Sequence, residues 1–378
     1  MSIRNNNLGS INKPGFNALG AQTSTTTYTY ELYSWGKNTS GQLGLGDVTN
    51  RSSPNQVGAL TTWSNIASGG VHTIATKTDG TLWSWGGNGS GQLGLGNVTA
   101  YSSPKQVGAL TAWLKVAGGY YYSIATKTDG TLWSWGANGY GQLGDGTTAT
   151  RSSPVQVGAL TTWSAIDNGR NHSIAIKTDG TLWSWGNNGV GQLGLGNVTA
   201  YSSPKQVGAL TTWLNIAAGD YFSYAIKTNG TLWSWGQPNR GQLGLGNLTY
   251  YSSPKQVGAL TNWSTIAGGA NFALATKTDG TLWTWGKNVQ GQLGLGNTTD
   301  YSSPKQVGAL TAWLKVACGY SNSLAIKTDE TIWSWGSNTN GQLGLGNTTN
   351  YSSPKQVGAL TAWYAISAGS SSTTALKY

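Results

Sequence analysis

The sequence predicts an all-β fold: a seven-bladed β-propeller of four-stranded blades. Its 378 residues contain seven copies of a 50-residue unit without an insertion, since "GQLG" begins at Gly41 and recurs every 50 residues to Gly341. A fixed period of this kind marks a repeat architecture, and four strand-like segments per unit describe a propeller blade. The composition, with 57 glycines, 20 tryptophans and 9% charged residues, also favours turn-rich β structure over helices.

The strands of one unit follow each other in the order A, B, C and D. In the first complete unit we expect them at 63–69, 73–78, 81–86 and 102–108. Asp79 and Gly80 form the tight hairpin between B and C. Trp83 and Trp85 lie two apart on strand C and therefore face the same side of the sheet, where they can fill the interface between blades.

The two ends of the repeat region complete one another. The last unit stops at Tyr378, equivalent to Thr78, and the first begins at Thr29, equivalent to Asp79. We therefore expect residues 29–378 to form the propeller, closed by N- and C-terminal strands that share one blade, which removes two open sheet edges. Residues 1–28 are polar and Thr-rich, and we expect a flexible leader or docking peptide there.

The recurring pattern "LWSWGxNxxGQLGLGNxTxYSSPKQVGALTxWxxIAxG", with x for varying positions, resembles the repeat of the regulator of chromosome condensation family. The resemblance implies a seven-bladed propeller. It does not select a function, because that family includes nucleotide exchange factors, a plant ultraviolet photoreceptor and secreted β-lactamase inhibitors. The photoreceptor carries Trp-Arg-His sets at turns that lack Trp here, which argues against light sensing. Every loop also keeps its length, so there is no inserted wedge that could act on a small GTPase, which argues against nucleotide exchange.

The three residues after a constant glycine, such as Gly69, are rewritten from unit to unit. No two of the seven triplets agree, and they use mainly aromatic and small polar residues, the composition of antibody-like binding surfaces. The triplets are Gly70-Val71-His72, Tyr120-Tyr121-Tyr122, Arg170-Asn171-His172, Asp220-Tyr221-Phe222, Ala270-Asn271-Phe272, Tyr320-Ser321-Asn322 and Ser370-Ser371-Ser372.

Two further variable groups lie between strands C and D, at 37–40 and around residue 50, with their equivalents in the other units. Because the strands alternate in direction, all three groups fall on one face, while the turns of the opposite face stay nearly constant. This favours a binding surface; the alternative is mere tolerance of exposed loops. The predicted ligand-binding residues are Val71, His72, Tyr120, Tyr121, Tyr122, Tyr140, Arg170, Asn171, His172, Asp220, Tyr221, Phe222, Arg240, Asn271, Phe272, Tyr320 and Asn322.

Other functional classes find little support in the sequence. The net charge of +10 is dispersed along the repeats, so we expect no specific nucleic acid as a binding partner. No segment is apolar enough to span a bilayer. We also expect no metal or other cofactor, since His72 and His172 have no matching ligand cluster. No nucleophile with a base can be assembled, so we expect no enzyme; the alternative is a site in the central funnel near Asp167, Arg170 and Asp220.

We therefore predict a non-enzymatic adhesin or decoration protein, placed on a virion surface. The leader would attach it to that larger assembly, and the variable face would bind a cell-surface protein or glycan. The main alternative is a soluble inhibitor or regulator that covers a protein partner with the same face.

Overall fold

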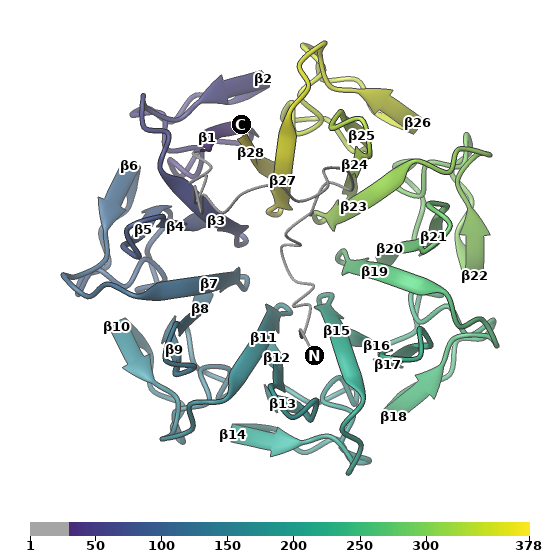
Figure 1. The fold of residues 1–378 in the computed structure, drawn as a ribbon, viewed down its shortest axis with the longest axis horizontal. Coiled ribbons are helices and arrows are strands. Elements are labelled where there is room, and N and C mark those ends of the chain that lie inside the picture. Colours follow the sequence, from purple (N-terminus) through teal and green to yellow (C-terminus); the bar gives the residue numbers. More distant parts are fainter. Residues whose placement is uncertain (1–29) are drawn as a thin grey trace, which may run out of the picture.

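Seven four-stranded antiparallel sheets surround a central axis in the computed structural model of the protein (Figure 1). The structure describes residues 30–378, all of whose regular elements are strands. This confirms the seven-bladed propeller predicted from the period. The predicted leader, residues 1–28, lies outside the described residues.

The four strands of each blade occupy equivalent places from the axis outward. The innermost are β3 (Trp63–Ser68), β7 (Trp113–Gly118), β11 (Trp163–Asn168), β15 (Trp213–Ala218), β19 (Trp263–Gly268), β23 (Trp313–Cys318) and β27 (Trp363–Ala368). The second are β4 (His72–Lys77), β8 (Tyr122–Lys127), β12 (His172–Lys177), β16 (Phe222–Lys227), β20 (Phe272–Lys277), β24 (Asn322–Lys327) and β28 (Ser372–Lys377). The third are β1 (Glu31–Gly36), β5 (Leu82–Gly86), β9 (Leu132–Gly136), β13 (Leu182–Gly186), β17 (Leu232–Gly236), β21 (Leu282–Gly286) and β25 (Ile332–Gly336). The outermost are β2 (Arg51–Gln56), β6 (Tyr101–Gln106), β10 (Arg151–Gln156), β14 (Tyr201–Gln206), β18 (Tyr251–Gln256), β22 (Tyr301–Gln306) and β26 (Tyr351–Gln356).

One blade is built from both ends of the described chain. Its strand order is β2-β1-β28-β27, and β1 pairs with β28 from Glu31 opposite Lys377 to Gly36 opposite Ser372. The shared closing blade is therefore confirmed. The two ends of the chain therefore meet inside a sheet, where β1 is paired on one side with β2 and on the other with β28.

The tryptophans pack between neighbouring blades, as their spacing on strand C predicts. Trp85 is fully buried, and its indole N–H donates to the backbone carbonyl of Gln42 in the preceding blade at 3.0 Å. The same bond recurs around the ring, closing with Trp35 and Gln342. Trp83 is half-buried and packs against the same cluster. Each blade interface therefore has an apolar core with its polar N–H group satisfied.

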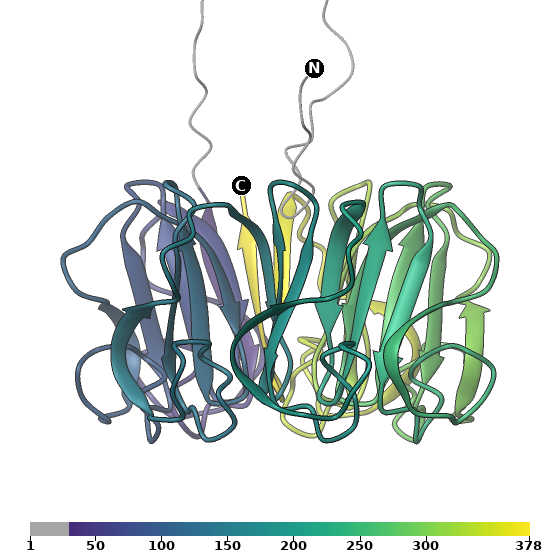
Figure 2. The same cartoon turned by 90° about the horizontal axis from the view of Figure 1, so that it is seen from below.

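The loops divide between two faces (Figure 2). The turns from the second to the third strand, such as residues 78–81, and the connections from the outermost strand to the next blade, such as 107–112, lie on what we call the constant face. It is at the top of Figure 2, where the C end lies. We call the opposite face the variable face. No helix that could cross a membrane occurs within residues 30–378.

Candidate binding face

The first two variable groups of every blade meet on the variable face. The triplets form the turns between the innermost and second strands, and the long loops from the third to the outermost strands end on the same side. The backbone N–H of Gly87 donates to the carbonyl of Val71 at 2.8 Å, and an equivalent bond joins Ala137 to Tyr121 at 2.9 Å. The triplets and the long loops therefore form one continuous surface.

The first residue of each triplet borders the central opening of this face. These seven residues, which we call the mouth ring, line a hollow of about 90 Å³ together with the constant glycines beneath them. The mouth ring consists of Gly70, Tyr120, Arg170, Asp220, Ala270, Tyr320 and Ser370. The sequence-based expectation that the triplets surround the central opening is thus met by the geometry.

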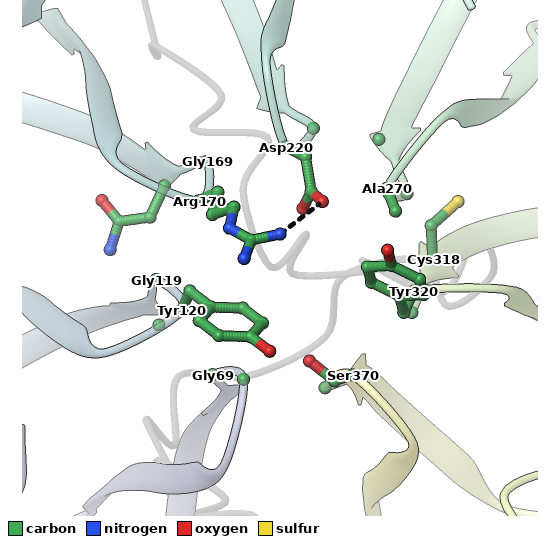
Figure 3. Close-up of a pocket in the computed structure, with 18 of the residues that line it drawn as sticks. Gly69, Gly119, Tyr120, Gly169, Arg170, Asp220, Ala270, Cys318, Tyr320 and Ser370 are labelled. Atoms are coloured by element: carbon green, nitrogen blue, oxygen red, sulfur yellow. Dashed lines mark ion pairs between the residues drawn. The ribbon is translucent and has the colours of Figure 1, made fainter. Parts of the chain in front are cut away.

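Arg170 is the centre of a charged and aromatic cluster in the mouth ring. Its guanidinium lies between Tyr120 and Asp220 (Figure 3). Nη1 is 3.7 Å from the Asp220 Oδ2, and the guanidinium carbon is 4.6 Å from the centroid of the Tyr120 ring. It also lies 5.9 Å from the ring centroid of Tyr221. Both the Coulombic contact and the cation–π contacts hold the arginine over the opening.

Partial exposure leaves this cluster able to bind a further group. The Arg170 side chain is 33% exposed and that of Asp220 17%. At 3.7 Å the two form an ion pair rather than a hydrogen bond, so the guanidinium N–H groups can turn to a ligand. Burial raises the pKa of the Asp220 carboxyl to about 6, against the opposing effect of the Arg170 charge. The cluster thus offers both a donor and an acceptor next to aromatic rings.

The second residue of each triplet lies outside the mouth ring and is also accessible. Tyr121 is 41% exposed, and its ring meets that of Tyr120 edge-on at a centroid distance of 4.5 Å. Val71, Asn171, Tyr221 and Asn271 are half-buried. The first and second positions therefore supply the side chains that a ligand on this face would contact.

The third position of the triplet is different, and its prediction as a ligand-binding position is wrong. Each of these residues opens the second strand of its blade, and its side chain points between blades rather than to the surface. All are at most 2% exposed: His72, Tyr122, His172, Phe222, Phe272, Asn322 and Ser372. Six of them were predicted ligand contacts. A buried side chain at this place determines how two blades pack, not what the face binds.

The histidines show how the third position works. His72 Nε2 lies 2.8 Å from Ser123 Oγ of the next blade, and His172 Nε2 lies 2.9 Å from Ser223 Oγ. Burial lowers the pKa of both imidazoles to about 3, so both are neutral near pH 7. The constant glycine before the triplet makes room for them, because a Cβ on Gly69 would come within 2.2 Å of the His72 ring.

The long loops form an outer rim. Tyr140 is 50% exposed, and the Arg240 side chain, 55% exposed, lies 3.7 Å from the Asp300 carboxylate on the loop of the next blade. Sequence reasoning did not select Tyr250, which is 50% exposed and whose hydroxyl donates to Asn239 Oδ1 at 2.5 Å. The sequence could have indicated Tyr250 as a contact residue, because the equivalent positions in two other units carry the small residues Ala100 and Ala200.

The seven repeats match the profile of a known protein family. Seven consecutive stretches match the profile of the regulator of chromosome condensation (RCC1) repeat: 31–76, 79–126, 129–176, 179–226, 229–276, 279–326 and 329–376. The chain belongs to the RCC1 repeat family.

Solved structures agree with this RCC1-repeat assignment. Human WBSCR16 superimposes with a TM-score of 0.84 at 22% identity, covering 92% of this chain and 100% of that one. Prp20p from Saccharomyces cerevisiae gives 0.81 at 20% identity, covering 93% and 92%. Yeast RCC1 (Prp20) in its complex with Kap60 gives 0.81 at 19%, covering 97% and 96%. At such identities the likeness shows the fold. No curated protein sequence matches the chain significantly.

The RCC1-repeat propeller places the residues of the predicted funnel site at two depths. Arg170 and Asp220 meet at the mouth, whereas Asp167 lies below them in the channel wall, where its Oδ2 accepts the backbone N–H of Ala218 at 2.8 Å. Within residues 30–378 there is no group of three or more His, Cys, Asp or Glu that could hold a metal. The accessible chemistry of this propeller is that of a protein-interaction module.

Proposed function

We propose that this protein is a non-enzymatic recognition module whose variable face binds a macromolecular ligand. The observation that carries the proposal is the Arg170 cluster, where an arginine, an aspartate and tyrosines from neighbouring blades converge around one opening. Arginine and tyrosine are the side chains that most often supply binding energy at interfaces. The other blades keep nearly the same framework without these side chains. This supports a role for them in contacting a ligand rather than in folding.

The partner we propose is a cell-surface protein or glycan, with the module acting as an adhesin or decoration protein on a larger assembly such as a virion. Tyrosine rings beside hydrogen-bonding groups suit both kinds of surface. The attachment half of this proposal depends on residues 1–28, outside the described residues. It therefore needs its own test: particles that assemble with the protein equally well after deletion of residues 1–28 would contradict the tether.

A second candidate, a soluble inhibitor or regulator, is favoured by one comparison. The yeast relative Prp20p is described with binding to Gsp1p and histones, so a propeller of this family binds proteins. The two candidates use the same face and differ in the ligand. One tight soluble protein target would favour the regulator, and binding to intact cells or their glycans would favour the adhesin.

The test is binding of the full chain to arrays of glycans and surface proteins, beside a variant with fewer side chains on the face. The chain itself supplies the replacement, because Ser370 and Ser371 occupy the first two triplet positions of one blade. The variant carries Y120S, Y121S, R170S, Y221S and Y320S and leaves the buried third positions intact. We expect it to fold and to lose binding.

A matched control changes the opposite face. Leu60 and Leu110 on the constant face are 49% and 52% exposed, and we expect the L60S/L110S variant to bind like the parent protein. If the five-serine variant binds as well as the parent while L60S/L110S does not, the binding surface is the constant face and the proposal is wrong.

A further inference from the structure

A channel lies beneath the mouth ring, between the seven innermost strands. Its volume is about 540 Å³, and every blade contributes to its wall. One layer of the wall is aliphatic and consists of Ile66, Val116, Ile166, Ile216, Ile266, Val316 and Ile366. Within the described part of the chain, the cationic side chains that line it are Lys115 on β7 and Lys315 on β23. The channel thus has aliphatic and polar groups in its wall, together with two positive charges.

These lysines occupy a position where two other blades carry asparagine. Asn65 and Asn215 each donate a side-chain N–H to the backbone carbonyl of the next blade, at 2.9 and 3.0 Å. Lys315 Nζ makes the same bond to the Tyr364 carbonyl at 2.6 Å, and Lys115 bonds the Ser164 carbonyl. An amide is therefore sufficient for this bond between blades. What lysine adds is a positive charge and further N–H donors.

Among the described residues, neither amine has a carboxylate partner. In residues 30–378 the ion pairs within 4.0 Å involve other residues, and the Lys315 Nζ instead lies 4.1 Å from the Tyr364 ring centroid. Burial lowers the pKa of the Lys315 amine to about 8. Asp167, the one carboxyl group in the described lining, accepts the Ala218 N–H. Half-buried cations without a counter-ion are costly, and an anion that enters the channel offsets this cost.

The two lysines come from strands on opposite sides of the ring. In the order of blades, β7 and β23 are three steps apart in one direction and four in the other, so they stand on opposite walls (Figure 1). An anion held by both must span the channel between these two strands. We propose that the channel is a second binding site, for a small organic dianion such as an aliphatic dicarboxylate whose two ends reach Lys115 and Lys315.

The experiment is calorimetric titration of the full chain with succinate, glutarate and adipate, and with inorganic phosphate as a compact anion. We expect saturable one-to-one binding of at least one dicarboxylate. The K115N/K315N variant keeps the inter-blade bonds, as Asn65 and Asn215 do, and should bind it at least about tenfold more weakly. D167N, which removes the channel's negative charge, should bind it more tightly.

Lys105 and Lys355 supply the matched control. Both are exposed on outermost strands, so K105N/K355N changes the net charge equally without touching the channel and should leave binding unchanged. Cys318 provides a readout that needs no lysine substitution, since it lines the channel and bound dicarboxylate should slow its alkylation in the parent protein.

Four outcomes would overturn the proposal. They are unchanged affinity in K115N/K315N, an equal loss in both lysine pairs, two phosphates bound per chain without dicarboxylate binding, and no saturable binding of any probe. An equal loss would mean general charge attraction, and two phosphates would mean two separate anion sites. Because binding at the variable face is tested with other variants, either proposal can fail alone.

Discussion

Glu330 adopts a left-handed backbone conformation in a turn where five equivalent positions carry glycine. Its φ is +63°, close to the +77° of Gly80 in the same hairpin of another blade. The hydrogen bonds of the turn are retained, since the Glu330 N–H still donates to the Lys327 carbonyl at 3.0 Å. The surrounding sheet therefore imposes a conformation that an L-residue with a Cβ disfavours.

Glu330→Gly should stabilise the protein by about 1 kcal/mol, the strain of the left-handed conformation less the extra backbone entropy of glycine in the unfolded chain. The midpoint of urea unfolding measures the effect. Glu330→Ala keeps the Cβ and should show no comparable gain. Equal stabilisation by both changes would mean that the Glu330 side chain, not its backbone, is unfavourable.

Asp167 gives a pH dependence of stability at the residue scale. Burial raises the pKa of its carboxyl to about 6, although two backbone N–H groups oppose the shift. Between about pH 4 and 6 the unfolded carboxyl is ionised while the folded one still holds its proton, so the free energy of unfolding falls as pH rises through this range.

Asp167→Asn removes this titration. We expect the stability of the parent protein, relative to D167N, to fall as pH rises from 4 to 7, by at most about 1.4 kcal/mol for each unit by which the pKa is raised. Thermal unfolding at several pH values measures it. A constant difference across that range would show that Asp167 has an ordinary pKa in the folded state.

At the scale of elements, a buried asparagine organises each long loop of the variable face. Asn88 Oδ1 accepts the Leu93 N–H at 3.0 Å, and its Nδ2 donates to the carbonyls of Asn97 and Thr99 at 3.0 and 2.9 Å. Six loops carry this asparagine, whereas the loop between β17 and β18 carries Pro238. Proline supplies neither the acceptor nor the donors, so this loop lacks three of the framework's bonds.

Pro238→Asn should therefore restore the bonds and slow hydrogen exchange at the Leu243 amide, with a gain of about 1 kcal/mol in stability. The reverse change, Asn88→Pro, should speed exchange at Leu93. Exchange measured residue by residue distinguishes the two loops. Unchanged protection at Leu243 in P238N would show that this loop has settled into a different conformation.

The same elements show what the sequence could and could not predict. Period and spacing predicted the sheets, their order and the face on which the triplets lie. They could not separate the buried third position from the exposed ones, because the framework accepts different side chains there: His72 and Tyr122 both lie against a serine of the next blade. Phe222 at the same position belongs to an apolar core that includes Ala273 of the next blade. The Arg170–Asp220 pair joins adjacent blades and requires the ring geometry.

At the scale of the whole molecule, stability depends on closing the ring. The joint between β1 and β28 buries Leu32 and Leu376, both 0% exposed, in one core with Trp63 of the next blade. Loss of β28 would leave β1 and β2 without their inner neighbours. The remaining blades would then end at an open interface on either side.

Truncation after Ser371 should cost at least about 3 kcal/mol, the scale of a lost buried leucine, and should abolish a single cooperative unfolding transition. Calorimetry and light scattering measure both effects. Tyr378→Ala, which leaves β28 in place, is the control and should keep the single transition. A truncated protein that unfolds like the parent would show that six blades suffice to hold the ring.

The shared blade also bears on folding fidelity. In the other blades the equivalent lysine lies over a tryptophan, as Lys77 does over Trp83 at 3.7 Å, but Lys377 pairs with Glu31 at 3.6 Å and meets Tyr33 in place of that tryptophan. Near-identical repeats invite exchange of strands between the wrong blades or between two chains. Glu31 distinguishes β1 from the other third strands, which have threonine at the equivalent position, so β28 meets at β1 an ion-pair partner that no other third strand offers when the ring closes.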